Sequence, residues 1–323
     1  MLLVYPDYTD RDSTKRVSGG NYSEGLASIS AVLKQGGHDV RLLHLLNLHT
    51  QEDFKRRLRE AGEFDIIGFS IRTTAFPDWF DLFIDMYKEE IGLPCTGNIR
   101  FDILTEETVK RMKEAGFYTI DMGLESGDQE MRFKYLRRYQ TDEMIINCSN
   151  WFHKYGIAQL TYNIIGLPYE DIHRALKTIK LNAKIKSDRT IPNIFYPYEG
   201  TPLYEISKQA GFIPEGDFTK RRVPLIQPQF PEEQVLFIEA YFMHFVRRYK
   251  LAYRLPSGIG RVYERWLDHR VTGRQVPYKA LVAIHDVYAA ARNSLKDFLV
   301  NHLPKLYMKL RMLKHRKKAE KAD

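Results

Sequence analysis

Residues Met122–Gly127 read Met-Gly-Leu-Glu-Ser-Gly, and this stretch decides the fold that we expect. It ends an apolar segment, 118–123, that predicts a buried strand. Glu125, Ser126 and Gly127 then supply a carboxylate, a hydroxyl and a glycine at the carboxyl end of that strand. This end of a parallel strand faces the functional site of a βα fold. The stretch therefore predicts a ligand-facing edge of a parallel sheet, and the alternative that Glu125 caps the next helix stays open.

A second candidate stretch, 161–168, reads Thr-Tyr-Asn-Ile-Ile-Gly-Leu-Pro and ends the next predicted strand. Gly166 has no side chain, so a ligand could approach the backbone closely, and Pro168 stiffens the turn. The following helix begins with free amide groups. We expect Glu170 and Asp171 to satisfy these amides internally, so this stretch alone is weakly specific.

The flanking charged and aromatic residues are less specific still. Arg132, Arg137 and Arg138 are expected on the helix after Gly127, where one could pair with a ligand carboxylate, although solvation at the surface is the commoner fate of such charges. The stretch 196–204 is rich in Tyr, Pro and Gly. It is interpreted as a rigid turn rather than as a catalytic segment.

Strands and helices alternate on both sides of these stretches. The expected strands are 2–5, 40–45, 65–71, 97–101, 118–123, 160–165 and 191–196. The expected helices between them are 25–35, 51–61, 79–90, one that Thr105 caps and Gly116 ends, 141–155 and 171–185. This spacing fits right-handed βα units in an open sheet or a partial barrel. After about Phe230 only helices are expected, at 232–253, 260–269, 278–299 and 303–314.

Composition limits the classes of protein that fit. The 323 residues allow about two domains and are 44% hydrophobic and 28% charged, as in ordinary globular chains. The chain has two cysteines, too few for a disulfide framework, which indicates a reducing cytosol. Cys95 is expected in a loop and Cys148 on an apolar helix face. Two thiolates are too few for a four-iron cluster held by this chain alone. Without a basic leader or an apolar run of about 20 residues, a cytoplasmic location is expected.

The net charge of +8 is concentrated near the C-terminus. No basic surface interleaved with aromatic residues is evident elsewhere, so nucleic-acid binding is not expected. The C-terminal helix carries an apolar stripe made of Leu299, Leu303, Leu306, Leu310 and Leu313. Such a basic helix could lie on an anionic membrane as a peripheral contact or dock on a partner, and packing against its own chain is the alternative.

Taken together in this order, the three stretches resemble radical SAM proteins, specifically the subgroup with an N-terminal cobalamin-binding domain. In that family Gly-Leu-Glu-Ser-Gly ends the fourth barrel strand, Gly-Leu-Pro-Gly-Glu-Thr follows the fifth, and Pro-Tyr-Pro-Gly-Thr-Pro-Leu-Tyr follows the sixth. The likeness runs from about Trp79 to Ile213. Shorter matches to the cobalamin module are 24–27, 37–40 and 65–70.

One signature of the family is missing. Its members hold three irons of a cluster through Cys-x-x-x-Cys-x-x-Cys after the first barrel strand, and this chain has no such motif. By comparison with the family, the chain has covered only half of the cobalamin-binding module at Thr74. At Trp79, five residues later, it already corresponds to a position after the second barrel strand. We therefore infer an internal deletion that removes the cluster motif. The Gly-rich turn and the Asp-x-His-x-x-Gly signature of the cobalamin module are missing as well.

The resemblance implies an α/β fold in three parts. A truncated Rossmann-like cobalamin-binding half-domain at 1–75 is joined to a partial TIM-type (βα) barrel at 76–215, followed by a basic α-helical extension at 216–323. One continuous sheet of about seven βα units is an alternative. The implied S-adenosylmethionine residues are Glu125, Ser126, Gly127, Arg138, Asn163, Gly166 and Pro168, and the implied cobalamin residues are Gly25 and Ser70. No catalytic residue and no metal ligand is expected.

Full-length relatives cleave S-adenosylmethionine reductively with a 4Fe-4S cluster, often with cobalamin, and modify a small molecule or lipid. In such enzymes the cofactors carry the difficult chemistry. This chain is expected to be a degenerate or inactive member that does not hold the cluster, so its status as an enzyme and its binding of the other two cofactors stay open. The alternatives are a non-catalytic binding or scaffold partner of an intact paralogue, and a gene fragment.

Overall fold

The computed structural model describes residues 1–6, 24–45, 51–70 and 78–309. Contacts within the chain divide it into two compact units. The first consists of Met1–Gly123 and Glu143–Thr161, and the second of Leu124–Asp142 and Tyr162–Asp323. Strands and helices alternate as far as residue 194, so the α/β class predicted from the sequence is confirmed.

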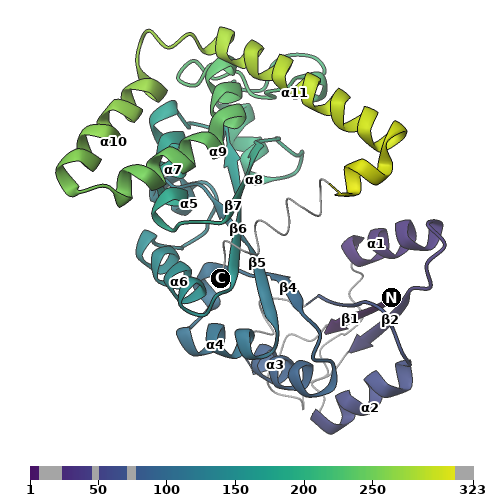
Figure 1. Ribbon diagram of the computed structural model, residues 1–323. Helices are drawn as coiled ribbons and strands as arrows, with labels where there is room; N and C mark the ends of the chain where they lie inside the picture. The colour runs from purple at the N-terminus through teal and green to yellow at the C-terminus, as the bar shows by residue number, and fades with distance from the viewer. Residues whose placement is uncertain (7–23, 46–50, 71–77, 310–323) are drawn as a thin grey trace. The chain divides into compact units, whose positions relative to one another are not determined.

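The first unit contains a three-stranded parallel sheet. Strand β1 (Leu2–Pro6) lies between β2 (Arg41–Leu45) and β3 (Ile67–Phe69). Figure 1 shows β1 beside β2. Helices α1 (Glu24–Gln35) and α2 (Gln51–Ala61) alternate with these strands. Residues 2–5 are almost inaccessible to solvent, as a central parallel strand with apolar side chains on both faces requires.

Helix α4 (Glu106–Glu114) shows how closely local sequence sets an element boundary in this unit. The Oγ1 of Thr105 accepts a hydrogen bond from Thr108 N at 3.2 Å, so Thr105 caps the helix as predicted. Leu104 and Val109, which occupy the two positions of a hydrophobic staple around this cap, are both buried. The unit also contains α3 (Asp78–Glu90), and α6 (Asp142–Lys154) falls almost wholly within it.

The predicted strand at 97–101 is wrong in its bounds. Strand β4 covers Cys95–Asn98, and a short 3-10 helix follows at Phe101–Ile103. The ring of Phe101 is buried within this turn, and Arg100 Nε donates to Asp102 Oδ1 at 3.0 Å. The burial of Phe101 and this ion pair stabilise a turn at a place where the sequence pattern suggested that the strand continued.

A second sheet has the order β4-β5-β6-β7, which follows the sequence. It is formed by β4, β5 (Phe117–Glu125), β6 (Ala158–Ile165) and β7 (Arg189–Ile194), and β4 and β5 are parallel. The alternative of one continuous seven-stranded sheet is wrong for the described residues. The reason is that β3 is an edge strand only three residues long that pairs with β1, whereas β4 pairs with β5.

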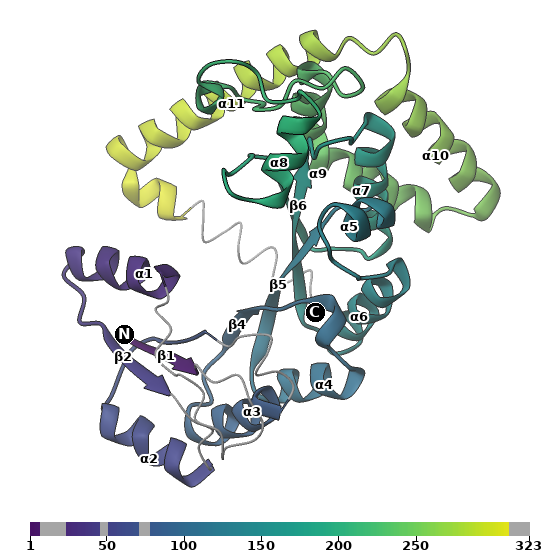
Figure 2. The ribbon, with the colours of Figure 1, turned by 180° about the vertical axis from the view of Figure 1, so that it is seen from behind.

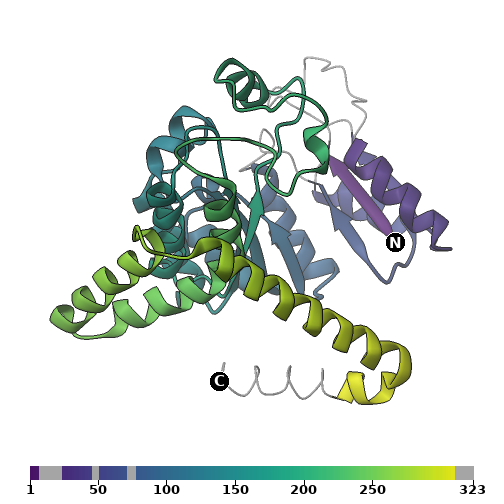
Figure 3. The same cartoon turned by 90° about the horizontal axis from the view of Figure 1, so that it is seen from above.

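The second unit ends in helices. Helix α7 (Ile172–Lys184) packs against α9 (Glu232–Arg254), which also contacts β7, α10 (Ser257–Thr272) and α11 (Tyr278–His302) (Figures 2 and 3). Helix α8 (Pro202–Gln209) precedes them. The core contains Ile179, Phe242, Val246 and Tyr249 among its fully buried residues. The α-helical extension expected from the sequence is thus present, and its central helix α9 is largely buried.

The C-terminal apolar stripe is described only in part. Leu303 and Leu306 are each 44% exposed, whereas Leu310 and Leu313 lie outside the described residues. Residues 304–309 form a further helical turn after α11. No helix in the described ranges is long and apolar enough to cross a membrane.

Candidate functional site

Glu125 is the last residue of β5, at the sheet edge that the sequence predicted. Its backbone has a positive φ of 62°, which is uncommon for a residue other than glycine and is often found at functional sites. Its carboxylate Oε1 lies 3.0 Å from Arg138 Nη2, so two predicted site residues are brought together. Burial raises the pKa of the Glu125 carboxyl, and Arg138 opposes this effect. A half-buried ion pair therefore marks the end of this strand.

The interpretation of Glu125 as a helix cap is wrong. Asp128 caps α5 (Gln129–Lys134), because its Oδ1 accepts a hydrogen bond from Met131 N at 3.2 Å. Asp128 also pairs with Lys177 of α7 at 2.8 Å. Asp128 thus caps α5 and helps to join it to α7, and Glu125 does not take part in the cap.

Ser126 and Gly127 form a tight connection between β5 and α7. Ser126 is fully buried, and its Oγ accepts a hydrogen bond from Asp128 N at 3.2 Å. Gly127 N donates to Thr178 Oγ1 at 2.8 Å. A Cβ on Gly127 would lie 2.4 Å from Lys177 O, so only glycine fits this approach of two backbones.

Arg132 is the main correction to the predicted site. It was expected at the surface, yet its side chain is fully buried. Its Nη1 donates to Ser126 O at 2.7 Å, its Nε donates to Gln140 O at 2.9 Å, and its Nη2 donates to Asp142. These acceptors explain the burial, since each of the three guanidinium nitrogens donates to one of them. Arg138, also expected on the helix, follows it in a loop, as does the exposed Arg137.

The second stretch places its polar groups against the protein's own atoms. Asn163 is fully buried in β6, and its Oδ1 accepts a hydrogen bond from Asn182 Nδ2 of α7 at 2.7 Å. Gly166 has a positive φ of 83°, as a close turn before Pro168 requires. Gly166 N donates to Glu170 Oε2 at 2.6 Å. The amide of Arg174 in the first turn of α7 donates to Asp171 Oδ1 at 2.8 Å, so the expectation that the start of the helix is satisfied internally is confirmed for Asp171. It is wrong for Glu170, which binds the amides of the preceding turn.

The segments that follow β5, β6 and β7 meet in one apolar cluster. Met131, Leu167 and Phe195, one from each segment, pack together with Phe212 and Leu225. Phe195 N also donates to Ile165 O at 2.8 Å. The segments that follow these three strands thus lie side by side, as expected for the carboxyl ends of neighbouring strands.

Glu170 has a proton affinity that predicts a pH effect on stability. Its carboxyl is fully buried, and burial raises its pKa from 4.5 to about 8. The folded chain therefore holds this proton more tightly than the unfolded chain does. The contribution of the protonated Glu170 to the free energy of unfolding is therefore fully present below about pH 4.5. It falls by about 1 kcal/mol per pH unit as pH rises toward about 8, the pKa in the folded chain.

Glu170→Gln keeps an oxygen for the amides of Gly166 and Leu167 but cannot ionise. We expect this variant to lack the fall in stability between pH 5 and pH 8, measured by urea unfolding at several pH values. Glu205→Gln, at an exposed position on α8, is the matched control and should keep the wild-type slope. A parallel pH profile for Glu170→Gln and wild type would contradict the assignment.

The two thiols do not fit a four-iron cluster. Cys148 lies on α6 and is buried as expected, but Cys95 begins β4 and does not lie in a loop. Burial raises the pKa of the Cys95 thiol to about 11 and raises that of Cys148 as well. Cluster iron needs three or four thiolates, whereas the sequence contains two cysteines. Among the described residues, no group of three His, Cys, Asp or Glu is arranged to hold a metal ion.

The two residues predicted for cobalamin lie in the first unit. Gly25 is exposed in the first turn of α1, and nothing lies within 4 Å of the position that its Cβ would take. Ser70 directly follows β3, and its N donates to Val4 O at 3.0 Å. Their assignment to cobalamin stays a prediction, as does the assignment of the seven residues for S-adenosylmethionine.

The third stretch lines one side of a pocket, and the sequence did not indicate the segment that lines the other side. Residues 196–199 line a pocket of about 400 Å³ together with 216–219. The ring centroids of Tyr196 and Phe218 are 5.8 Å apart. The aromatic loop was visible in the sequence, but the opposing segment about 20 residues later carries no pattern that indicates a pocket.

Part of the chain matches a known protein family. Residues 33–181 match the model of the Radical SAM superfamily. An uncharacterized methyltransferase of Pyrococcus horikoshii is 26% identical over 174 residues, which is 52% of this chain and 37% of that protein. The chain therefore spans little more than a third of this curated relative.

Several solved structures share a limited likeness with this chain. The radical SAM enzyme coproporphyrinogen III oxidase from Escherichia coli is 14% identical with a TM-score of 0.37, covering 73% of this chain and 51% of its own. The methyltransferase TsrM from Kitasatospora setae, solved with cobalamin and a 4Fe-4S cluster, is 13% identical with a TM-score of 0.34, covering 75% and 54%. Archaeal Elp3 from Methanocaldococcus infernus is 16% identical with a TM-score of 0.43, covering 83% and 62%.

Proposed function

We propose that this chain is a degenerate relative of cobalamin-dependent radical SAM methyltransferases that does not by itself cleave S-adenosylmethionine. The observation that carries the proposal is the set of thiols in the whole sequence. Of only two cysteines, Cys148 is buried in a helix and Cys95 has a raised pKa. Without a third thiolate this chain cannot hold the cluster that would deliver an electron to the sulfonium.

The polar atoms at the strand ends support the same proposal. The carboxylate of Glu125 binds Arg138, Ser126 Oγ accepts from a backbone amide, and Asn163 Oδ1 accepts from Asn182. In the family these positions would face the adenosylmethionine, whereas here each has a protein partner. The three-stranded βα arrangement of the first unit supports a further proposal, that residues 1–75 derive from a cobalamin-binding module.

Anaerobic reconstitution with iron and sulfide tests the proposal. We expect less than one cluster per chain by iron and sulfide counting, and no 5′-deoxyadenosine after addition of dithionite and S-adenosylmethionine. An intact radical SAM enzyme treated in parallel shows that the reconstitution works. A stoichiometric cluster with the absorbance and EPR signals of 4Fe-4S, or formation of 5′-deoxyadenosine, would overturn the proposal.

A second candidate function is that of a binding partner of an intact paralogue. Helix α11 carries exposed apolar residues on one stripe, namely Ile284, Val287, Tyr288, Leu295 and Phe298, which are 53–71% exposed. Exposed apolar surface of this extent is typical of interaction sites. We expect co-expression with the paralogue to yield a complex by size-exclusion chromatography, and Val287→Glu with Leu295→Glu to abolish it. Separate elution of the two proteins would contradict this function.

A further inference from the structure

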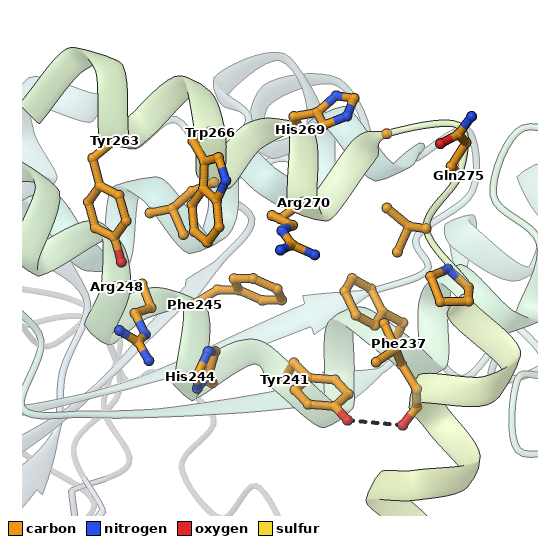
Figure 4. Close-up of a pocket in the computed structure, with 15 residues that line it drawn as sticks. Phe237, Tyr241, His244, Phe245, Arg248, Tyr263, Trp266, His269, Arg270 and Gln275 are labelled. Carbon is orange, nitrogen blue, oxygen red and sulfur yellow. Dashed lines mark hydrogen bonds between the residues drawn. The ribbon is translucent and has the colours of Figure 1, made fainter.

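A pocket of about 670 Å³ opens among α9, α10 and the start of α11, entirely within the second unit (Figure 4). Its buried apolar lining includes Phe237 and Phe245 from α9 and Leu267 from α10. Tyr263 and Trp266 of α10 add aromatic side chains. Small-molecule sites are typically concave, about 300–1,000 Å³ in volume and mostly apolar, and this pocket has those properties.

The charged lining of this pocket is basic. Its four basic side chains are His244, Arg248, His269 and Arg270, and no Asp or Glu lines it. The acidic residues of α10 are engaged elsewhere, since Glu264 and Asp268 bind Lys180 of α7 at 2.9 and 2.8 Å. Across the described part of the chain, neither Arg248 nor Arg270 has a carboxylate within ion-pair distance. Two arginines therefore face an apolar pocket without a counterion from the protein.

The position of Arg270 is fixed by stacking. Its guanidinium carbon lies 5.1 Å from the centre of the Trp266 ring, and Trp266 in turn stacks on Tyr263 with ring centroids 5.7 Å apart. Figure 4 shows Arg270 between these α10 aromatics and the phenylalanines of α9. A stacked arginine keeps its donors free for a carboxylate or phosphate, because the ring occupies only the face of the guanidinium.

The positive charge of the pocket does not depend on His244. Burial lowers the pKa of His244, and the neighbouring Arg248 and Arg247 lower it further. His244 is therefore neutral near pH 7, whereas Arg248 and Arg270 stay charged and set up a positive field in the pocket. The basic C-terminal segment of this chain would be repelled by that field, so it does not suit the pocket as an occupant.

We propose that this pocket binds a small organic anion, with an aromatic or other apolar body against Phe237, Phe245 and Trp266 and an acidic group held by Arg248 and Arg270. The acidic group could be a carboxylate, sulfonate or phosphate, which share the acceptor geometry that arginine recognises. This site lies in the helical extension, apart from the strand ends. It requires neither a cluster nor S-adenosylmethionine, so the proposal stands independently of the proposed function.

A pair of dyes that differ in charge tests the proposal on the full chain. The probe is 1-anilinonaphthalene-8-sulfonate, and its neutral counterpart N-phenyl-1-naphthylamine has the same aromatic body without the sulfonate. We expect saturable binding of one anionic dye per chain, energy transfer from Trp266, and at least tenfold weaker binding of the neutral dye. Trp266→Phe should remove most of the energy transfer while the dye still binds.

Charge variants locate the site. Arg248→Gln and Arg270→Gln are each expected to weaken binding of the anionic dye about five- to tenfold, because each removes one charge-assisted contact at a partly exposed site. Neither change should alter binding of the neutral dye. Arg265→Gln is the matched control, since Arg265 is exposed on α10 but does not line the pocket. Thermal unfolding of each variant confirms that the helices are intact.

Three results would overturn the proposal. The first is equal affinity for the two dyes, which would show an apolar surface without recognition of an anion. The second is an equal loss on Arg265→Gln, which would indicate only long-range attraction to a basic helix. The third is binding that does not change in the Arg248→Gln and Arg270→Gln variants, which would place the dye elsewhere.

Discussion

Replacing Arg132 with methionine is expected to lower the free energy of unfolding by about 3–4 kcal/mol, because two main-chain carbonyls lose their donor and the half-exposed carboxylate of Asp142 loses its ion pair. The guanidinium is fully buried and donates to the carbonyls of Ser126 and Gln140 and to the carboxylate of Asp142. Methionine fills a similar volume but donates no hydrogen bond. It would therefore leave two main-chain acceptors without their partner in the interior.

Urea unfolding with a matched pair of variants measures this effect. Lys134→Met is made on the same helix, at an exposed position, and is expected to change stability by less than about 0.5 kcal/mol. Arg132→Lys should recover only part of the loss, since one ammonium group cannot reproduce three directions of a guanidinium fork. Wild-type stability in Arg132→Met would show that water replaces the guanidinium, and the segment from Ser126 to Asp142 would then be held by other contacts.

Most of the secondary structure could be predicted because it depends on neighbours in the sequence. The hydroxyl of Thr105 caps α4 by accepting a hydrogen bond from Thr108 N, three residues ahead. Asp171 caps α7 in the same way, by accepting from Arg174 N. Apolar residues at helical spacing indicate the buried face of a helix, and Ile145, Cys148 and Phe152 on α6 are all buried. In each of these cases the deciding contact lies within one or two turns of the chain.

The site could be predicted only in part, because its deciding contacts join distant segments. The stretch at Glu125 was placed correctly at a strand end, but its ion pair with Arg138 depends on the path of the intervening loop. The burial of Arg132 depends on carbonyl groups, which every residue has and no sequence pattern reveals. The pocket between α9 and α10 likewise arises from helix packing, so Phe245 and Trp266 appeared in the sequence only as ordinary apolar residues.

Gly127→Ala is expected to destabilise the second unit by about 3 kcal/mol, at the upper end of the usual cost of overpacking. The added methyl group would lie 2.4 Å from both Lys177 O and Thr178 Cα. These are main-chain atoms of α7, so rotation of a side chain cannot relieve the clash. The segment after β5 and the helix must separate, which also breaks the 2.8 Å hydrogen bond from Gly127 N to Thr178 Oγ1.

Two further variants distinguish this clash from a general effect of replacing glycine. Gly258→Ala lies in the first turn of α10 with no atom near its Cβ position, and it is expected to be neutral or to stabilise by up to about 1 kcal/mol. Thr178→Ala in the Gly127→Ala background should not rescue stability, because the crowded atoms remain. Rescue by Thr178→Ala, or wild-type stability of Gly127→Ala, would mean that α7 can move away from β5 at little cost. The end of β5 would then be an adaptable edge of the sheet, and the ion pair of Glu125 with Arg138 could open to admit a ligand.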